Sequence, residues 1–402
     1  MLGLAGCSGG TNRGSGEIVL AHPASTEMTR LYADAADAFE RDHPGKQVRP
    51  LPITGSDYYG KLLVLMAAQE SPDVVWMGQG FGEFADRGVF LDLEARVRAD
   101  PSLDASEMPA EVLNWYRANG RLSGLPFGLD LNFIVYNQDL FDAAREPYPR
   151  WDWTLEQFLA TARRLTHDRD GDGKAEVWGY RGGMEPFSFG AHLLTADHTA
   201  PDVASPEMIR YLRFSLDLMY RWKVSPPIAA SDLEEQESMV DFQSGRVAML
   251  HGHSWLLPDL RKRMAGRRWE ICPPPGVNGR AHWASSQGFC ISRDTRDPET
   301  SWQLLRYLVT SDALWPLADH VAPVKKALRT RMLREFGISR PDLRVLSEAV
   351  DHLNADPRVP NLTELRSRLS DAVERVIQRR AEPEAAMRVA SREIAEVLAR
   401  RH

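Results

Sequence analysis

The chain has 402 residues, of which 43% are hydrophobic and 26% charged, and its formal net charge is −7. This length exceeds what one hydrophobic core usually supports and predicts two domains. Basic residues such as Arg261, Lys262 and Arg263 occur in short clusters among apolar residues, which indicates solvated helix faces rather than a nucleic-acid-binding surface. The sequence has no run of the roughly 18 apolar residues that a membrane-spanning helix needs.

The amino terminus carries a short lipoprotein-like motif. Residues 4–7 (LAGC) resemble the lipobox of bacterial lipoproteins, in which the cysteine receives the lipid. Residues 8–16 are rich in Gly and Ser and are typical of a flexible tether. Most of the usual leader is missing, which a misplaced start codon would explain. We expect a periplasmic or cell-surface protein anchored through lipidated Cys7, with a chance cysteine in a terminal tail as the alternative.

The first part of the chain predicts a parallel α/β sheet. Three short apolar runs are typical of buried strands, at residues 17–21, 48–53 and 72–77. Amphipathic helical segments separate these runs, and Pro50 and Pro52 favour an edge or an irregular second strand. Ligands of such sheets bind beyond the carboxyl ends of the strands. That binding edge contains the loops at residues 22–27, 54–57 and 76–80.

The second part alternates predicted strands and helices. We expect strands at residues 132–136, 247–250 and 288–292. We expect helices at residues 153–165, 206–222, 233–244, 298–310 and 362–401. Thr154 is a predicted helix cap, and residues 251–255 are predicted to form a loop. Cys272 and Cys290 flank a predicted strand turn, and we favour two buried thiols over a disulfide.

Several short strings occur together in a fixed order. They are AFERDHPG (38–45), YYGKL (58–62), SPDVVW (71–76), GLP (124–126), YNQDLF (136–141), WT (153–154), FQSGRVAM (242–249) and GFCIS (288–292). Each string mostly encodes core and turns, but their order and spacing are specific. The series resembles the sugar-type extracellular solute-binding proteins of ABC importers, the group that includes maltose-binding protein. The resemblance covers nearly everything from Glu17 onward.

The resemblance implies a two-lobed α/β periplasmic-binding-protein fold in which crossover segments join the lobes. The crossovers would fall near Asp130, residues 273–276 and residues 321–323. The first lobe would hold residues 17–129 and 276–322, and the second would hold residues 130–275 and 323–402. The resemblance also implies capture of a small solute, most simply a sugar, by hinge closure. It further implies delivery to importer permease subunits, by a monomer without catalytic residues or an organic cofactor.

Two stretches depart from the family pattern. The loop after the first strand often carries aromatic residues in these proteins, but here it reads HPASTE (22–27). A glycine pair is common before Gly288, but here residues 285–287 are SSQ. Because both stretches belong to the expected binding cleft, they bear on the identity of the ligand more than on the fold.

Carbohydrate sites combine aromatic platforms with planar hydrogen-bonding side chains. Trp76, Trp255 and Trp283 lie at predicted strand ends or in loops of the cleft, and their alternative role is core or hinge packing. Asp130 lies at the first crossover and Glu185 lies in a glycine-rich segment, although a strand-end cap or a solvated loop would explain such residues too. The remaining candidate ligand contacts are Ser25, Thr26, Glu27, Gln79, His253, Ser286 and Gln287.

Residues 168–176 (DRDGDGKAE) resemble the first half of a calcium-binding loop. The candidate ligands are Asp168, Asp170, Asp172, Lys174 through its carbonyl, and Glu176 at the ninth position. The twelfth position is Gly179 instead of the bidentate Glu of an EF-hand. We expect one structural calcium ion here, with a solvated acidic turn as the alternative.

Two other functions compete with sugar capture. The same fold can bind a peptide, a polyamine or an organophosphate. A secreted glycoside hydrolase would need two facing carboxylates, for which Asp130 and Glu185 are conceivable but no sequence feature pairs them. The phosphate loop and the HExxH zinc motif are absent from the sequence, which disfavours an enzyme.

Overall fold

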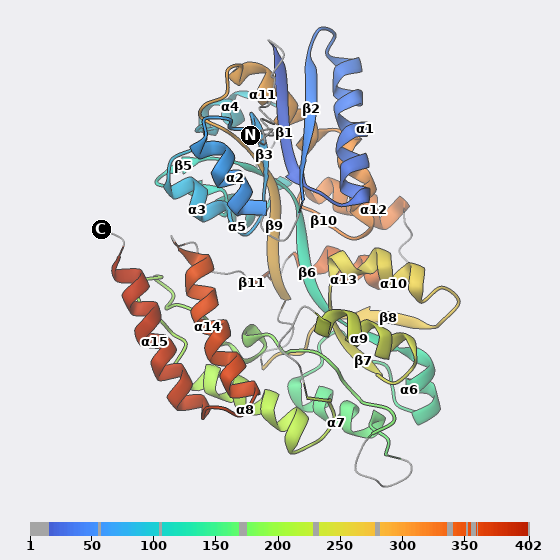
Figure 1. Cartoon of the computed structure of the whole chain (residues 1–402). Helices are drawn as coiled ribbons and strands as arrows, with labels where there is room; N and C mark the ends of the chain where they lie inside the picture. Colours follow the sequence, from blue (N-terminus) through green and yellow to red (C-terminus); the bar gives the residue numbers. More distant parts are fainter. Residues whose placement is uncertain are drawn as a thin grey trace, which may run out of the picture. The chain divides into compact units, whose positions relative to one another are not determined.

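The computed structural model describes residues 16–54, 58–103, 107–168, 175–227, 233–277, 282–335, 341–350, 353–354, 359 and 361–400 (Figure 1). The chain forms two compact units. Unit 1 comprises Met1–Ala105, Tyr116–Phe127 and Gln287–Pro316. Unit 2 comprises Ser106–Trp115, Gly128–Ser286 and Leu317–His402.

Unit 1 is built on a mixed sheet. Strand β1 (Glu17–Pro23) pairs in parallel with β2 (Gln47–Ile53) and with β3 (Val74–Met77). Strand β3 pairs antiparallel with the second half of β9 (His282–Ile291). The helices of the unit are α1 (Thr26–Asp42), α2 (Tyr58–Ala67), α3 (Phe81–Asp86), α4 (Glu94–Ala99) and α11 (Pro298–Thr310), and β4 (Arg117–Ala118) pairs with β5 (Arg121–Leu122).

The burial pattern explains why β1 lies inside this sheet. Its five central residues are all buried, as expected for a strand covered on both faces. Strand β2 ends the strand order, so the edge position predicted from Pro50 and Pro52 is confirmed. The predicted loop at 22–27 is wrong at its end, because Ser25 accepts a hydrogen bond from the Met28 backbone N–H at 3.1 Å and caps a helix that begins at Thr26.

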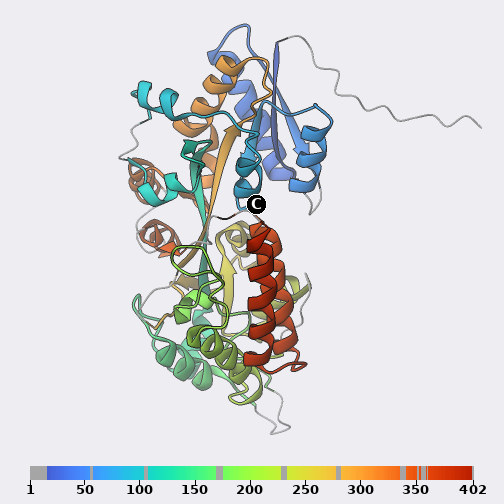
Figure 2. The ribbon, with the colours of Figure 1, turned by 90° about the vertical axis from the view of Figure 1, so that its left-hand side faces the viewer.

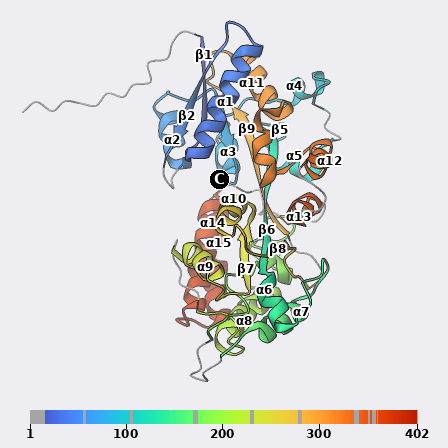
Figure 3. The same ribbon diagram turned by 90° about the vertical axis from the view of Figure 1, so that its right-hand side faces the viewer.

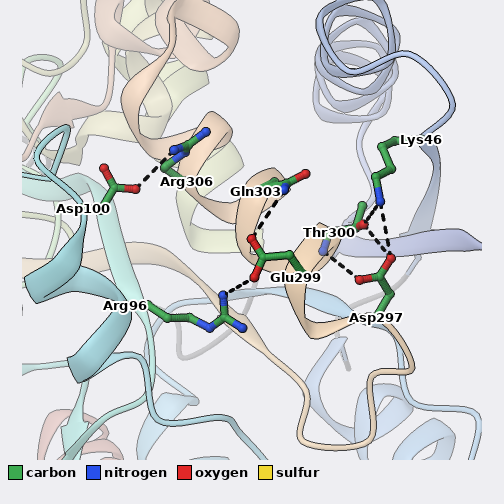
Figure 4. A network of polar contacts seen from close by, with 8 residues as sticks. All are labelled: Lys46, Arg96, Asp100, Asp297, Glu299, Thr300, Gln303 and Arg306. Atoms are coloured by element: carbon green, nitrogen blue, oxygen red, sulfur yellow. Dashed lines mark hydrogen bonds and ion pairs between the residues drawn. The ribbon is translucent and has the colours of Figure 1, made fainter.

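Polar contacts fasten helix α11 to neighbouring segments of unit 1 (Figure 4). Asp297 accepts a hydrogen bond from the Thr300 backbone N–H at 2.9 Å and so caps the helix. Lys46 Nζ donates to Thr300 Oγ1 at 2.6 Å. Two ion pairs extend the network toward α4, between Arg96 and Glu299 at 2.8 Å and between Arg306 and Asp100 at 3.3 Å.

Unit 2 is organised around the long strand β6 (Leu125–Asn137), most of which it contains. β6 pairs antiparallel with β7 (Met249–His253), β8 (Trp269–Cys272) and β10 (Ala322–Pro323), and Figure 3 shows β7 and β8 alongside it. Its helices are α5 (Ala110–Asn114), α6 (Gln138–Ala144), α7 (Leu155–Leu165), α8 (Pro206–Tyr220), α9 (Leu233–Gln243), α10 (Leu257–Arg263), α12 (Lys326–Glu335), α13 (Pro341–Ala349), α14 (Leu362–Ile377) and α15 (Pro383–Ala399). Strand β11 (Leu353–Asn354) pairs with the first half of β9.

Two corrections concern the carboxyl-terminal part of the chain. The uninterrupted helix predicted at 362–401 is wrong, because Arg379 adopts a left-handed φ of 56° and Pro383 begins a second helix. The resulting helices α14 and α15 lie side by side and both pack against α8 (Figure 2). Among the described residues, the structure contains no helix that is both long and apolar enough to cross a membrane.

The borders of the two units differ from the expected lobe borders. Residues 106–115, 128–129, 276–286 and 317–322 belong to unit 2, although the expected first lobe included them. For residues 276–286 the reason is that β9 is one continuous strand, so the border falls within it instead of at the proline-rich connector before it. Cys272 and Cys290 are both buried thiols and form no disulfide, as predicted.

Candidate ligand-binding site

An aromatic and polar cluster in unit 2 brings together five side chains, which we call the Trp255 cluster. Its members are Glu185, His251, His253, Trp255 and Trp283. His253 stacks on Trp255 with ring centroids 4.2 Å apart and planes 3° apart. Trp283 stands edge-on to Trp255, at 6.5 Å and 85°. Trp255 is 43% exposed and is the one exposed tryptophan of the described chain, while Trp283 is only 8% exposed.

Strand pairing positions the aromatic members. Strand β7 ends at His253 and passes directly into a 3-10 turn (Ser254–Leu256) that carries Trp255. Trp283 lies near the start of β9, where its backbone N–H donates to Asn132 Oδ1 at 2.9 Å. The predicted loop at 251–255 is therefore wrong in part, because β7 continues to His253 through its pairing with β6.

The glycine-rich segment 182–186 brings Glu185 to the same place. The preceding residues run parallel to β7, since the Arg181 backbone N–H donates to the Met249 carbonyl at 2.9 Å and the His251 N–H donates to the Arg181 carbonyl at 3.0 Å. Gly182 has a φ of 120°, and a Cβ atom there would lie 2.7 Å from the Cβ of His251. Glycine thus lets the segment approach β7 closely, and Glu185 Oε1 lies 3.6 Å from His251 Nε2.

Burial sets the charge of these polar groups. It raises the pKa of Glu185 to about 7, against a smaller opposing effect of Arg366. It lowers the pKa of His251 to about 4. Burial also lowers the pKa of His253 well below its usual value, and the adjacent His251 adds to that effect. Both imidazoles are therefore neutral near pH 7, when each ring has one nitrogen that can accept a hydrogen bond or bind a metal.

Asp130 lies beside this cluster on β6. The Ser254 hydroxyl donates to Asp130 Oδ1 at 3.3 Å, and the same hydroxyl accepts from the Leu131 backbone N–H at 3.2 Å. Asp130 thus supports the turn that carries Trp255. Ser286 lies further along β9, and its buried hydroxyl makes no hydrogen bond with the described residues.

The other candidate ligand contacts belong to unit 1. Trp76 lies within β3, and its ring packs edge-on against that of Tyr58 with the centroids 5.8 Å apart. Its buried indole Nε1 makes no hydrogen bond with the described residues. Gln79 is exposed just after β3, and Gln287 is half-buried on β9. Ser25, Thr26 and Glu27 are exposed at the start of α1, where Ser25 serves as its cap.

The calcium and lipid predictions fall largely outside the described residues. Cys7, Asp170, Asp172 and Lys174 all lie there. Asp168 and Glu176 are described, and a bridge between His167 and Val177 holds these two ends of the segment together. The Glu176 backbone N–H donates to the His167 carbonyl at 3.0 Å.

His251 is the member of the cluster that sequence reasoning missed as a site residue. A strand predicted at residues 249–253 would have identified it, because the side chains of His251 and His253 are two residues apart and therefore share one face of the strand. A separate pocket in unit 2 borders Gly182–Met184 and is lined further by residues of α8 and α14, among them Leu218 and Val373. The described lining of that pocket includes no member of the Trp255 cluster.

Comparison with known proteins shows the same fold. An ABC substrate-binding protein from Listeria monocytogenes, solved in complex with cycloalternan, is 21% identical with a TM-score of 0.82, covering 95% of this chain and 99% of that one. The sugar-binding protein MalE from Xanthomonas citri is 19% identical with a TM-score of 0.81, covering 96% and 98%. A solute-binding protein from Thermotoga lettingae bound to α-D-tagatose is 20% identical with a TM-score of 0.79, covering 95% and 99%.

These likenesses show that the chain has the two-lobed α/β fold of periplasmic binding proteins, and they confirm the predicted fold class. The family model described as "Bacterial extracellular solute-binding protein" matches residues 22–314. That match covers well over half of the chain and confirms the resemblance inferred from the sequence strings. The chain belongs to the bacterial extracellular solute-binding protein family.

Proposed function

We propose that the protein binds a carbohydrate at the Trp255 cluster and delivers it to an ABC importer. The observation that carries this proposal is the exposed Trp255 ring, which is backed by His253 and flanked at a right angle by Trp283. A sugar presents a flat apolar face that stacks on such a ring, and its hydroxyls need polar partners around that ring. Glu185 and Asp130 supply carboxylates close to this platform.

The similar structures support the class of solute. Their descriptions include a protein in complex with cycloalternan and one bound to α-D-tagatose. Identities near 20% do not transfer a particular sugar to this chain.

A thermal-shift screen tests the class of ligand. Mono- and oligosaccharides, sugar alcohols, polyamines, peptides and phosphate esters are compared, and a carbohydrate is expected to raise the melting temperature. Stabilisation by one of the other classes, with none by any carbohydrate, would overturn the proposal. Turnover of the stabilising compound would show an enzyme instead of a binding protein.

Substitution of the two tryptophans tests the location. Trp255→Ala and Trp283→Ala are each expected to weaken binding of the screened sugar at least tenfold, which corresponds to about 1.4 kcal/mol, in isothermal titration calorimetry. Trp151→Ala is the matched control, because Trp151 is a half-buried tryptophan of the same unit that stacks under Arg344. Unchanged affinity in both cluster variants would show that the sugar binds elsewhere.

We also propose that Cys7 carries a lipid anchor. The support is the LAGC motif followed by a Gly/Ser-rich tether. After expression in a bacterial host with an intact export leader, the protein is expected in the membrane fraction, and the Cys7→Ser variant in the soluble fraction. Membrane retention of Cys7→Ser would contradict the proposal.

We further propose that the segment 168–176 binds one structural calcium ion. The alternating carboxylates at 168, 170 and 172 support it, as does the bridge that brings the ends of the segment together. Calcium is expected to raise the melting temperature of chelator-treated protein, and the double variant Asp170→Ala, Asp172→Ala is expected to abolish that rise. Absence of any calcium effect on the unmodified protein would refute this site.

A further inference from the structure

Three side chains of the Trp255 cluster are of the types that bind metal ions and lie close together. Each of Glu185, His251 and His253 offers one ligand atom, and these three atoms all lie within 4.8 Å of one another. They come from two segments that the backbone holds side by side, the glycine-rich segment 182–186 and strand β7. The grouping therefore results from the fold and not from adjacency in the sequence.

Two of the imidazole nitrogens in this group have no hydrogen-bond partner. His251 Nε2 and His253 Nδ1 are buried, and neither makes a hydrogen bond with a described residue. The carboxylate oxygen Glu185 Oε1 lies 3.6 Å from His251 Nε2, which is too long for a hydrogen bond. An unsatisfied buried polar atom is energetically costly, so these two nitrogens indicate a bound group.

The geometry points to a binding site for one divalent transition-metal ion of the zinc class, held by Glu185, His251 and His253. Two imidazole nitrogens and one carboxylate oxygen are ligands that suit zinc, nickel, cobalt and copper, whereas calcium and magnesium prefer oxygen ligands alone. Zinc bound by three protein side chains keeps a fourth position open for water or another oxygen ligand. The inference goes beyond sugar capture and does not depend on it.

The one ligand-to-ligand distance that is resolved fits such an ion. Ligand atoms that each lie 2.0–2.1 Å from a tetrahedral zinc ion are separated by roughly 3.4 Å. The separation of 3.6 Å between Glu185 Oε1 and His251 Nε2 is close to this value.

The open position gives the site a further property. Because Glu185, His251 and His253 all belong to the Trp255 cluster, a hydroxyl or carbonyl oxygen of a bound solute would be able to serve as the fourth ligand. The competing explanation is that solute hydroxyls satisfy the two nitrogens directly, with no metal. A measurement of metal binding without any solute separates these two explanations.

The test is a titration of untagged, chelator-treated full-length protein with zinc chloride in the absence of sugar. Isothermal titration calorimetry is expected to show one tight site, and cobalt(II) is expected to give the intense visible absorption bands of a four- or five-coordinate ion. His251→Ala, His253→Ala and Glu185→Gln are each expected to weaken zinc binding at least tenfold. His251→Gln serves as a second, milder variant if the alanine variant unfolds.

The matched control is His192→Ala, which removes an exposed histidine of the same unit. It is expected to bind zinc as the unmodified protein does. Absence of a one-to-one zinc or cobalt complex, or zinc binding that survives in the folded double variant His251→Ala, His253→Ala, would overturn the inference. Failure of the sugar screen would leave this result unaffected, because no sugar is present in the titration.

Discussion

Gly182→Ala tests directly whether the glycine-rich segment must approach strand β7. Gly182 has a φ of 120°, a backbone conformation that residues with a Cβ atom rarely adopt. The new Cβ would lie 2.7 Å from the Cβ of His251, so the segment or the strand would have to move by about 0.7 Å to reach an ordinary contact of 3.4 Å. The substitution therefore disturbs both the local backbone and the position of Glu185 relative to His251.

The expected loss in the free energy of unfolding is the sum of a backbone cost and a packing cost. The unfavourable backbone conformation costs about 1–3 kcal/mol, and the displacement of a packed strand adds about 1 kcal/mol. A total of about 2–4 kcal/mol lowers the melting temperature by roughly 4–16 °C for a domain of 150–250 residues. We also expect weaker binding of zinc and of the screened sugar, because Glu185 and His251, which are proposed to contact them, are displaced.

Gly183→Ala is the matched control for this prediction. A Cβ at Gly183 would meet no atom within 4 Å, so this variant is expected to change the melting temperature by little. Differential scanning calorimetry of both variants and the unmodified protein measures the difference. Equal losses in the two variants, or no loss in Gly182→Ala, would refute the close approach on which the site is built.

Three further outcomes are expected. Asp297→Ala removes the cap of helix α11 and should cost about 1 kcal/mol of unfolding free energy in urea titrations, whereas a loss near zero would show that the contact with Thr300 is dispensable. The hydrogen bond from Arg164 holds the pKa of Glu146 below its usual value, so Glu146 contributes stability that is present above about pH 4.3 and is lost as the pH falls through its folded pKa. Glu146→Gln should flatten this acid-side loss in melting curves, and an unchanged pH profile would contradict the assignment. Tyr180→Phe removes a 2.7 Å hydrogen bond to a carbonyl of the glycine-rich segment and should cost about 1 kcal/mol, a prediction that fails if its stability matches that of the unmodified protein.

Local signals predicted most of the elements of this fold. The helix at 298–310 begins at Pro298 and ends at Thr310 as expected, because its cap and its apolar stripe are both encoded within the segment. Thr154 caps helix α7 as predicted, in a reciprocal capping box with Gln157. These features depend on residues within three or four positions of one another, so the sequence alone suffices to predict them.

The candidate site could be predicted only in part, because its members meet through long-range pairing. Trp255 and Trp283 were identified from their places near strand ends, but nothing local brings Glu185 beside His251. That contact depends on backbone hydrogen bonds between residue 181 and strand β7. The break at Arg379 in the carboxyl-terminal helix was missed although Pro383 signals it, since the residue before a proline disfavours the helical conformation.

The antiparallel pairing of β3 with β9 has a consequence for the order in which the protein is made. Val75 pairs with Cys290, so one edge of β3 has no partner from β9 until the ribosome has added more than 200 further residues. At about 5–20 residues per second this interval lasts roughly 10–40 s. An apolar strand with an open edge is prone to pair with other chains during that time.

Neither unit is a single stretch of chain, and this limits how the protein can be divided. A truncation after residue 127 would retain β1, β2 and β3 but would lack the second half of β9 that completes the unit 1 sheet. A fragment of that kind would expose the edge of β3 permanently. Dissecting the two units experimentally therefore calls for circular permutation or for co-expression of complementary fragments rather than for simple truncation.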